Sequence, residues 1–223
     1  MKKILIKLPA LLLIACILTL SFAACGKEPS PLDVYEEDTD TEKKDMYYVA
    51  MNVRDYGVMI FLLDAQNSPI TVENFVKLVR EDFYDGLTFH RVLSGFMIQG
   101  GDPNADGTGS SPNKIYGEFA ENGYENNFID HRKGVISMAR SSSMNSASCQ
   151  FFICNDTNAN VSYSLDGKYA SFGWIVYGEE VIDAITNATA PYGDSNGFIS
   201  NKSKQAVIEE IRVIKYDEDS AEQ

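Results

Sequence analysis

Few of the side chains on which most enzyme chemistry depends occur in this sequence of 223 residues. Its two histidines, His90 and His131, belong to no HExxH motif, and its cysteines form no CxxC pair, so the usual zinc-binding spacings are absent. There is no GxSxG turn either, and Ser-His-Asp hydrolysis would need one of the two histidines beside a serine. The glycine-containing run at 107–109 is too short to cradle a dinucleotide. We therefore expect a chemistry that uses neither a metal nor a cofactor.

A calcium site is also excluded by what is missing. Asp102, Asn104, Asp106 and Gly107 match the opening of an EF-hand loop. The twelfth position, however, is Asn113, where a bidentate glutamate is required, and no helix pattern leads into the loop. We predict no metal site.

Basic residues are scarce. Lys and Arg number 19 against 32 Asp and Glu, which gives a net charge of −13. Removal of residues 1–24, which hold three lysines and no acid, would bring the net charge to −16. Nucleic acids bind to clustered cations, so we expect no nucleic-acid partner.

The first 24 residues have the layout of a secretory signal. Three lysines near the start are followed by residues 8–24, which carry no charge. A retained transmembrane anchor is the alternative, because this run approaches spanning length. The alanine pair before Cys25 favours cleavage there and resembles a bacterial lipoprotein signal, in which the cysteine becomes diacylated. Phe22 stands where such signals prefer Leu, and Cys16 is formally a better match, but cleavage there would leave an apolar mature N-terminus.

Three further segments follow the signal. Residues 27–45 hold eight acidic side chains and almost no apolar ones, so we predict that 25–45, beginning with lipidated Cys25, is a disordered tether. Residues 46–217 are long enough for one domain with a sizeable core, and 218–223 form a polar tail.

The two cysteines outside the signal are predicted to be free thiols. Cys149 and Cys154 lie five residues apart in one extended segment, which places their Cα atoms beyond disulfide reach and their side chains on opposite faces.

Within the domain, short strand-like runs, helical spacing of apolar residues and abundant turn residues predict many short strands and two helices. One helix begins at Ser68-Pro69, with Val72, Phe75, Val76 and Val79 on one face. The other is expected over 179–187, and a long loop over 101–127. Strands are expected over 47–54, 58–63, 88–93, 96–100, 134–139, 150–154, 171–176 and 207–216. This pattern favours a closed β-barrel capped by helices.

One short stretch combines polar and apolar side chains as a binding pocket does. Regular alternation along 88–93 would put Phe89 and Arg91 on one face. Phe96, Met97 and Gln99 follow within eight residues of Arg91. On its own Arg91 would be a solvated surface residue, but here it lies among aromatic residues and near a glutamine.

Five ordered blocks resemble the signature segments of the cyclophilins: FHRV (89–92), FMIQGGDP (96–103), GVISMAR (134–140), NSASCQFFI (145–153) and LDGKYASFG (165–173). The likeness spans residues 47–216, and the segment 139–150 is similar to the bacterial form. The resemblance implies a mainly β fold, a closed eight-stranded antiparallel barrel capped by two α-helices.

The resemblance also implies an activity and its site. Cyclophilins are peptidyl-prolyl cis/trans isomerases, which need no cofactor. By motif position Arg91 would donate a hydrogen bond to the prolyl nitrogen and Gln99 would orient it. The residues that would contact the proline-containing substrate are Phe96, Met97, Ala139, Arg140, Gln150, Phe152, Leu165 and Tyr169.

Three departures from the family pattern concern the rim of this pocket. Ser164 stands where many cyclophilins have a tryptophan that helps bind cyclosporin, so we expect weak inhibition by this drug. Tyr169 replaces a usual histidine, and residues 148–149 are bulkier than the usual pair.

The sequence thus predicts a monomeric isomerase for proline-containing polypeptides, lipid-anchored at the extracytoplasmic face of the cell membrane. The alternative is a scaffolding module that binds proline-containing peptides without turnover.

Overall fold

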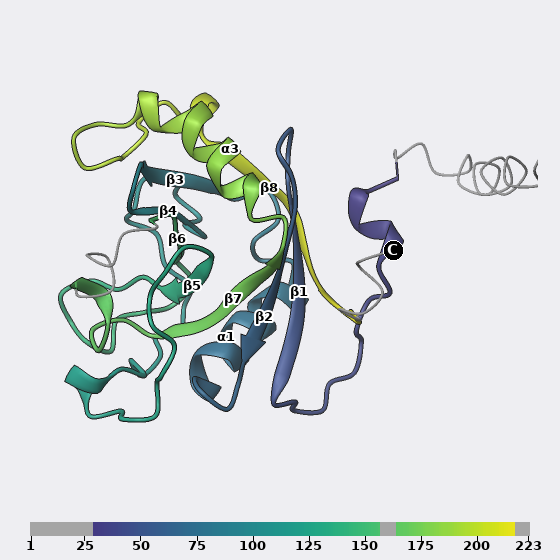
Figure 1. Ribbon diagram of the computed structural model, residues 1–223, viewed down its shortest axis with the longest axis vertical. Coiled ribbons are helices and arrows are strands. Elements are labelled where there is room, and N and C mark those ends of the chain that lie inside the picture. Colours follow the sequence, from purple (N-terminus) through teal and green to yellow (C-terminus); the bar gives the residue numbers. More distant parts are fainter. Residues whose placement is uncertain (1–28, 157–163, 217–223) are drawn as a thin grey trace, which may run out of the picture.

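Antiparallel strands close into a barrel in the computed structural model, which describes residues 29–156 and 164–216. The described strands are β1 (Met46–Val53), β2 (Gly57–Asp64), β3 (Thr88–Leu93), β4 (Met97–Gly100), β5 (Val135–Met138), β6 (Phe151–Cys154), β7 (Ser171–Tyr177) and β8 (Ala206–Ile214). Around the barrel they follow the order β1-β2-β7-β5-β6-β4-β3-β8 (Figure 1). The predicted closed eight-stranded barrel is confirmed.

The β1–β2 hairpin shows how alternation builds the barrel. Its strands pair residue for residue, from Met46 opposite Asp64 to Val53 opposite Gly57. Val49 in β1 packs into the core inside the barrel, whereas its neighbour Ala50 packs into a smaller cluster outside it. The barrel wall is therefore apolar on both sides at this point, and its outer side requires a cover.

Helices α1 (Pro69–Arg80) and α3 (Glu180–Thr189) lie at opposite ends of the barrel (Figure 1). Pro69 occupies the first turn of α1, where its missing N–H costs nothing. Phe75 of α1 and Ile182 of α3 are buried in the core that fills the barrel. Full burial of such side chains stabilises the fold by about 1.5–3 kcal/mol each. Both predicted helices are confirmed.

Residues 29–45, called the N-terminal strap below, cover the outer apolar cluster. The strap includes the 3-10 helix η2 (Pro31–Val34), in which Leu32 is completely buried against Ala50, Ile60 and Ile214. The prediction of a disordered tether is therefore wrong for residues 29–45. One leucine is sufficient because the barrel supplies the complementary apolar surface. Cys25 and the rest of the predicted signal and tether lie outside the described residues, as does the tail 218–223.

The acidic side chains of the strap are compensated by cations of the domain and of the strap itself. Asp33 lies 3.0 Å from Arg212, Asp38 lies 2.5 Å from Lys44, and Glu36 pairs with Lys215. The strap backbone also pairs with the end of β8: the Asp38 N–H donates to the Val213 carbonyl at 2.9 Å. β3 pairs only with Ala206 and Val207 at the start of β8, so the later residues of β8 have no partner in β3. The strap covers this edge at the end of β8.

The long predicted loop is present between β4 and β5, and its only described regular element is η3 (Ala120–Asn122). Two more 3-10 turns, η4 (Ala190–Tyr192) and η5 (Lys202–Lys204), follow α3. Cys149 and Cys154 are buried and free, as predicted. Within residues 29–156 and 164–216, no helix has the length and apolar character needed to cross a bilayer.

Candidate active site

A β-bulge in β3 turns Arg91 to the outside of the barrel. Phe89 lies opposite Gly100 and Arg91 lies opposite Gln99, so β3 has one residue more than β4 over this stretch. The extra residue is His90. Phe89 therefore points into the barrel core, while Arg91 points outward and is half-buried. The prediction that Phe89 and Arg91 share a face is wrong, because the bulge interrupts the alternation.

The Arg91 guanidinium is held from three sides. Its Nη1 donates to the Gln99 Oε1 at 3.2 Å, and its Nε donates to the Asn196 carbonyl at 2.8 Å. Its Cζ lies 5.2 Å from the centre of the Phe198 ring, a cation–π contact. Burial lowers the pKa of Arg91, an effect that Tyr169 and Asp194 oppose. An arginine nonetheless remains protonated at neutral pH.

Gln99 connects Arg91 to the loop that follows β4. The Gln99 Nε2 donates to the Gln150 Oε1 at 2.9 Å, and the Gln150 Nε2 donates to the carbonyls of Gly109 at 2.8 Å and Gly107 at 3.2 Å. The loop can pack this closely because residue 109 is a glycine. A Cβ atom at this position would lie 1.9 Å from the Asp102 carboxylate. This chain of hydrogen bonds fixes both glutamines and, through them, the guanidinium.

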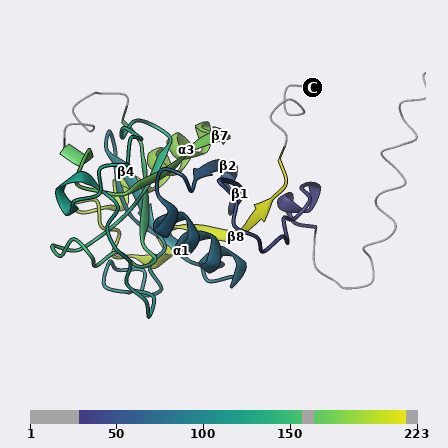
Figure 2. The same cartoon turned by 90° about the horizontal axis from the view of Figure 1, so that it is seen from below.

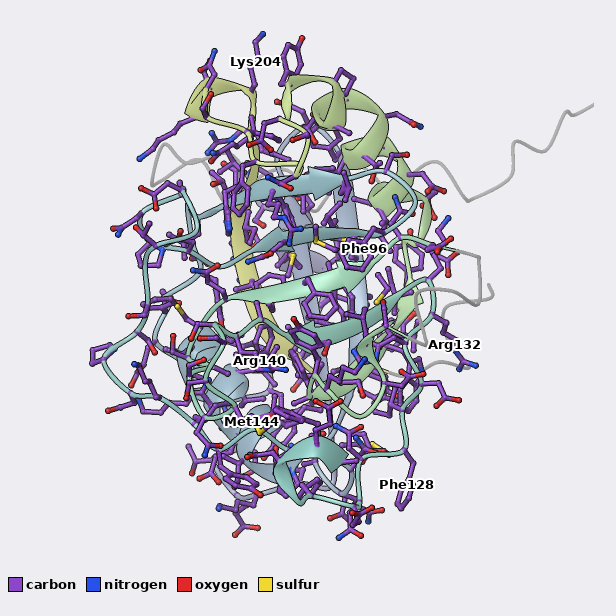
Figure 3. The ribbon with its side chains drawn as sticks, turned by 90° about the vertical axis from the view of Figure 1, so that its left-hand side faces the viewer. Phe96, Phe128, Arg132, Arg140, Met144 and Lys204 are labelled. Carbon is purple, nitrogen blue, oxygen red and sulfur yellow. The ribbon has the colours of Figure 1, made fainter. Side chains whose placement is uncertain are left out.

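Beside Arg91 the outer wall of the barrel is hollowed into a small pocket of about 90 Å³. Its lining residues are Arg91, Phe96, Met97, Gln99, Ala139, Arg140, Phe152, Leu165 and Tyr169. Met97, Phe152 and Leu165 belong to one apolar cluster that packs on the outside of β4 and β6. Figure 3 looks onto this face, with Phe96 and Arg140 in front. The pocket offers apolar walls for one small side chain and a cation at its rim.

A larger groove of about 440 Å³ adjoins the pocket. Arg91, Gln99, Ala139 and Arg140 line both cavities, so the two meet along these residues. Gln150 lines the groove together with the loop residues from Gly107 to Ser110. An extended peptide can therefore place one residue in the pocket and its neighbours in the groove.

A second polar network lies behind the pocket. The His131 ring stacks under Phe152 with an angle of 15° between the planes, and its Nδ1 lies 2.7 Å from Asp166. Its Nε2 lies 2.9 Å from the Ser137 hydroxyl. These groups have the connectivity of a Ser-His-Asp hydrolase, but Ser137 is completely buried and no substrate carbonyl can reach it. The network instead supports the Phe152 ring from below.

The structure brings the predicted site residues together. All of them except Gln150 line the small pocket, and Gln150 binds Gln99 at its edge. Sequence reasoning missed Asn196, Phe198 and His131. Asn196 and Phe198 are distant from Arg91 in the chain and come from an irregular loop, so no periodicity indicates them. The paired arrangement of His131 with Asp166 likewise depends on tertiary structure.

Comparison with known proteins agrees with this geometry. The family described as "Cyclophilin type peptidyl-prolyl cis-trans isomerase/CLD" matches residues 48–216. The chain belongs to the cyclophilin family. As a cyclophilin it is a peptidyl-prolyl cis-trans isomerase, and its substrates are proline-containing polypeptides.

Relatives from bacteria support the assignment. The peptidyl-prolyl cis-trans isomerase A of Dickeya dadantii is 40% identical over 164 residues, which cover 71% of this cyclophilin and 80% of the relative. An isomerase of Helicobacter pylori is 37% identical over 158 residues, covering 70% and 89% of the two chains.

Solved structures share the fold. A Cryptosporidium parvum cyclophilin type isomerase has a TM-score of 0.64 at 25% identity, with 77% of this cyclophilin and 99% of that chain covered. The same protein in the presence of the dipeptide Ala-Pro has a TM-score of 0.62 at 27% identity, with 76% and 99% covered.

Proposed function

We propose that this cyclophilin accelerates rotation about Xaa-Pro bonds in secreted or surface proteins, with the proline ring in the small pocket and Arg91 as the hydrogen-bond donor to the prolyl nitrogen. The observation that supports the proposal best is the position of the Arg91 guanidinium at the rim of an apolar pocket of about 90 Å³. Phe96, Met97, Phe152 and Leu165 would hold the ring.

The chemistry fits this arrangement. Resonance in the peptide bond gives a rotation barrier of about 18–20 kcal/mol. In the twisted transition state the prolyl nitrogen loses conjugation and regains a lone pair, to which a cationic donor binds more strongly than to either planar form. No covalent bond breaks, so the residues need only bind and polarise the amide. Each 1.36 kcal/mol of preference for the twisted state increases the rate about tenfold.

The fixed position of Arg91 supports the role of a donor. Its Nε and Nη1 are occupied by Asn196 and Gln99, while its Nη2 donates to no residue within the described ranges. A preorganised group of this kind needs no rearrangement when the transition state forms. Gln99 would orient the guanidinium and bind the substrate backbone beside it.

We further propose that Cys25 carries a lipid anchor and that the groove faces away from the membrane. Cys25 precedes Ser30, at the start of the strap, by five residues, which span about 18 Å at most. Figures 1 and 2 place the strap on the side of the barrel opposite β4, and Figure 3 places Phe96 and Arg140 on the β4 side. A short anchor at the strap would therefore leave the groove open to clients outside the membrane.

We also propose that the protein is monomeric. Among the described residues the strands close into a barrel and the strap covers the end of β8, so little strand edge is open for pairing with a second copy. Light scattering of the detergent-solubilised protein, with the detergent contribution subtracted, tests this; a mass of two chains would contradict it.

The test of the isomerase site is a proline-isomerisation assay of the mature protein and its Arg91→Ala variant. We expect kcat/KM to fall about 10²–10³-fold, as it does when one preorganised donor is removed from an active site. Arg132→Ala, which removes an exposed arginine outside both cavities, is the matched control and should retain full activity. Equal rates for wild type and Arg91→Ala would exclude the proposed role.

The anchor is tested separately by mass spectrometry of the mature N-terminus. We expect a mature chain that begins with a diacylated Cys25, and no acylated species in Cys25→Ser. A mature chain that begins at any other residue would refute the anchor without affecting the isomerase assignment.

A further inference from the structure

The cavities carry positive charge in a molecule that is strongly acidic overall. The chain has a net charge of −13, yet the lining of the pocket and the groove contains Arg91, Arg140 and Lys114 and no carboxylate. Arg91 faces the reacting amide in the proposed function, which leaves Arg140 and Lys114 to contact the flanking residues of a client. A groove of this composition discriminates between substrates by charge.

From this we infer that the enzyme prefers clients with an acidic side chain in the two residues before the proline, and that Arg140 is the principal specificity-determining residue. The inference rests on the proposed placement of the proline in the small pocket. By the cyclophilin resemblance, the residues before the proline would run along the groove past Ala139 and Arg140. Arg140 lines both cavities and therefore lies where these residues leave the pocket.

Arg140 is well positioned but not neutralised. Its Nε donates to the Lys168 carbonyl at 2.9 Å and its Nη1 donates to the Ser141 carbonyl at 3.0 Å. Its Cζ lies 4.7 Å from the centre of the Tyr169 ring and 5.0 Å from that of Phe119. All these partners are uncharged groups, and none of the ion pairs among the described residues includes Arg140. The side chain is therefore fixed with its full charge available to a ligand.

Two carboxylates in loops near the cavities, Asp194 and Asp102, accept hydrogen bonds from their own loops. Asp194 accepts from the backbone N–H groups of Asn196 and Phe198, at 2.8 and 3.0 Å. Asp102 accepts from the N–H of Asn104 at 2.8 Å, and neither carboxylate lines the pocket or the groove. A client carboxylate in the groove would thus face cations directly.

The net negative charge of the protein does not cancel this local preference. At physiological ionic strength the Debye length is about 8 Å, so the charges on distant faces are screened while a contact with Arg140 is not. An exposed charge pair contributes up to about 1 kcal/mol, which corresponds to about fivefold in affinity.

A panel of proline peptides that differ only in the two positions before the proline tests the inference. Glu, its neutral isostere Gln, and Lys are placed there in turn, and kcat/KM is measured for the mature protein at about 0.02 M and about 1 M ionic strength. We expect the Glu peptides to exceed the Gln peptides about threefold to fivefold at low salt, the Lys peptides to be poorest, and the differences to shrink at high salt. Equal values for all three peptides, with the Gln peptide still isomerised, would overturn the inference.

Substitutions of the cationic residues test whether Arg140 causes the preference for acidic peptides. Arg140→Gln should bring the Glu-to-Gln ratio close to one, while Arg140→Lys should retain a reduced preference, and Lys114→Gln should lower the ratio slightly. Arg132→Gln removes the same charge from the same face of the molecule but away from the groove, and should leave the ratio unchanged (Figure 3). An unchanged ratio in a folded Arg140→Gln protein would exclude Arg140 as the determinant. Loss of the proposed function would look different: the Gln peptide would then be isomerised equally by wild type and Arg91→Ala.

Discussion

Arg91 and Gln99 face each other across the β3–β4 ladder, and the Arg91 Nη1 donates to the Gln99 Oε1 at 3.2 Å. Gln99 in turn donates to Gln150, which is fixed by two backbone carbonyls of the loop. The guanidinium is thus oriented by a path of hydrogen bonds that ends in the backbone. Removal of either glutamine side chain from this path should therefore affect activity through the orientation of Arg91.

We predict that Gln99→Ala lowers kcat/KM about tenfold, because the guanidinium loses one of its two fixed hydrogen bonds and samples unproductive orientations. Gln150→Ala should have a smaller effect of the same kind. The double variant should be no worse than Gln99→Ala, since both residues act along one path. Strictly additive effects in this double-mutant cycle would contradict the proposed path.

The strap should contribute to stability without contributing to catalysis. We predict that Leu32→Ala lowers the free energy of unfolding by about 2–5 kcal/mol, because it removes a completely buried side chain and exposes part of the outer apolar cluster. Urea unfolding measures this change, and kcat/KM should stay at the wild-type value. Val34→Ala is the matched control on the same 3-10 turn: Val34 is 81% exposed, so its loss should change stability by less than about 0.5 kcal/mol. A Leu32→Ala protein as stable as wild type would show that the strap does not hold the barrel.

Stability should fall as the pH is lowered from 7 to 5, a window set by the ordinary histidine pKa of about 6.5. Burial lowers the pKa of both His90 and His131, although Asp102 opposes the shift at His90 and Asp166 opposes it at His131. Below the ordinary pKa the unfolded chain binds protons that the folded protein does not, so protonation favours unfolding. Each histidine contributes a slope of up to about 1.4 kcal/mol per pH unit until its folded pKa is reached.

Urea unfolding across this pH range measures the slope, and the doubly substituted His90→Gln, His131→Gln protein should show a flatter dependence whatever its absolute stability. Stability that rises toward pH 5 in the wild type would contradict the prediction.

The two cysteines of the domain should be unreactive in the folded protein. Burial raises the pKa of Cys154 to about 12 and also raises that of Cys149, so neither forms the reactive thiolate at neutral pH. In a protein with Cys16→Ser and Cys25→Ser, a thiol reagent should label neither residue under native conditions and both in guanidinium chloride. Failure to label either cysteine after unfolding would indicate a disulfide.

Much of the barrel could be predicted from the sequence because its signals are local. Two strand-like apolar runs joined by a short turn predict β1 and β2, and the spacing of Val72, Phe75 and Val76 predicts α1, all of which the structure confirms. The motif blocks likewise predicted the small pocket, since each block is a short strand or turn that the barrel brings to one outer face.

The failures have equally physical causes. A bulge adds one residue to β3 and reverses the alternation after Phe89, and a periodicity argument has no means of placing such an insertion. The acidic composition of the strap predicts disorder, but its order depends on an apolar patch formed by β1, β2 and β8 together. Asn196 and Phe198 reach Arg91 from a distant loop that carries no motif.

The bulge in β3 means that the direction of Arg91 is set by its pairing with Gln99 and not by its distance from Phe89 along the chain. Deleting His90 would restore regular pairing with Arg91 still opposite Gln99, so Arg91 would remain outside the barrel and Val92 would remain directed into the core. A homologue with a one-residue gap here therefore keeps the arginine on the outer face, as long as the arginine pairs with the glutamine of β4. When cyclophilin sequences of this kind are aligned, a gap at this position is consequently less informative than replacement of the arginine itself.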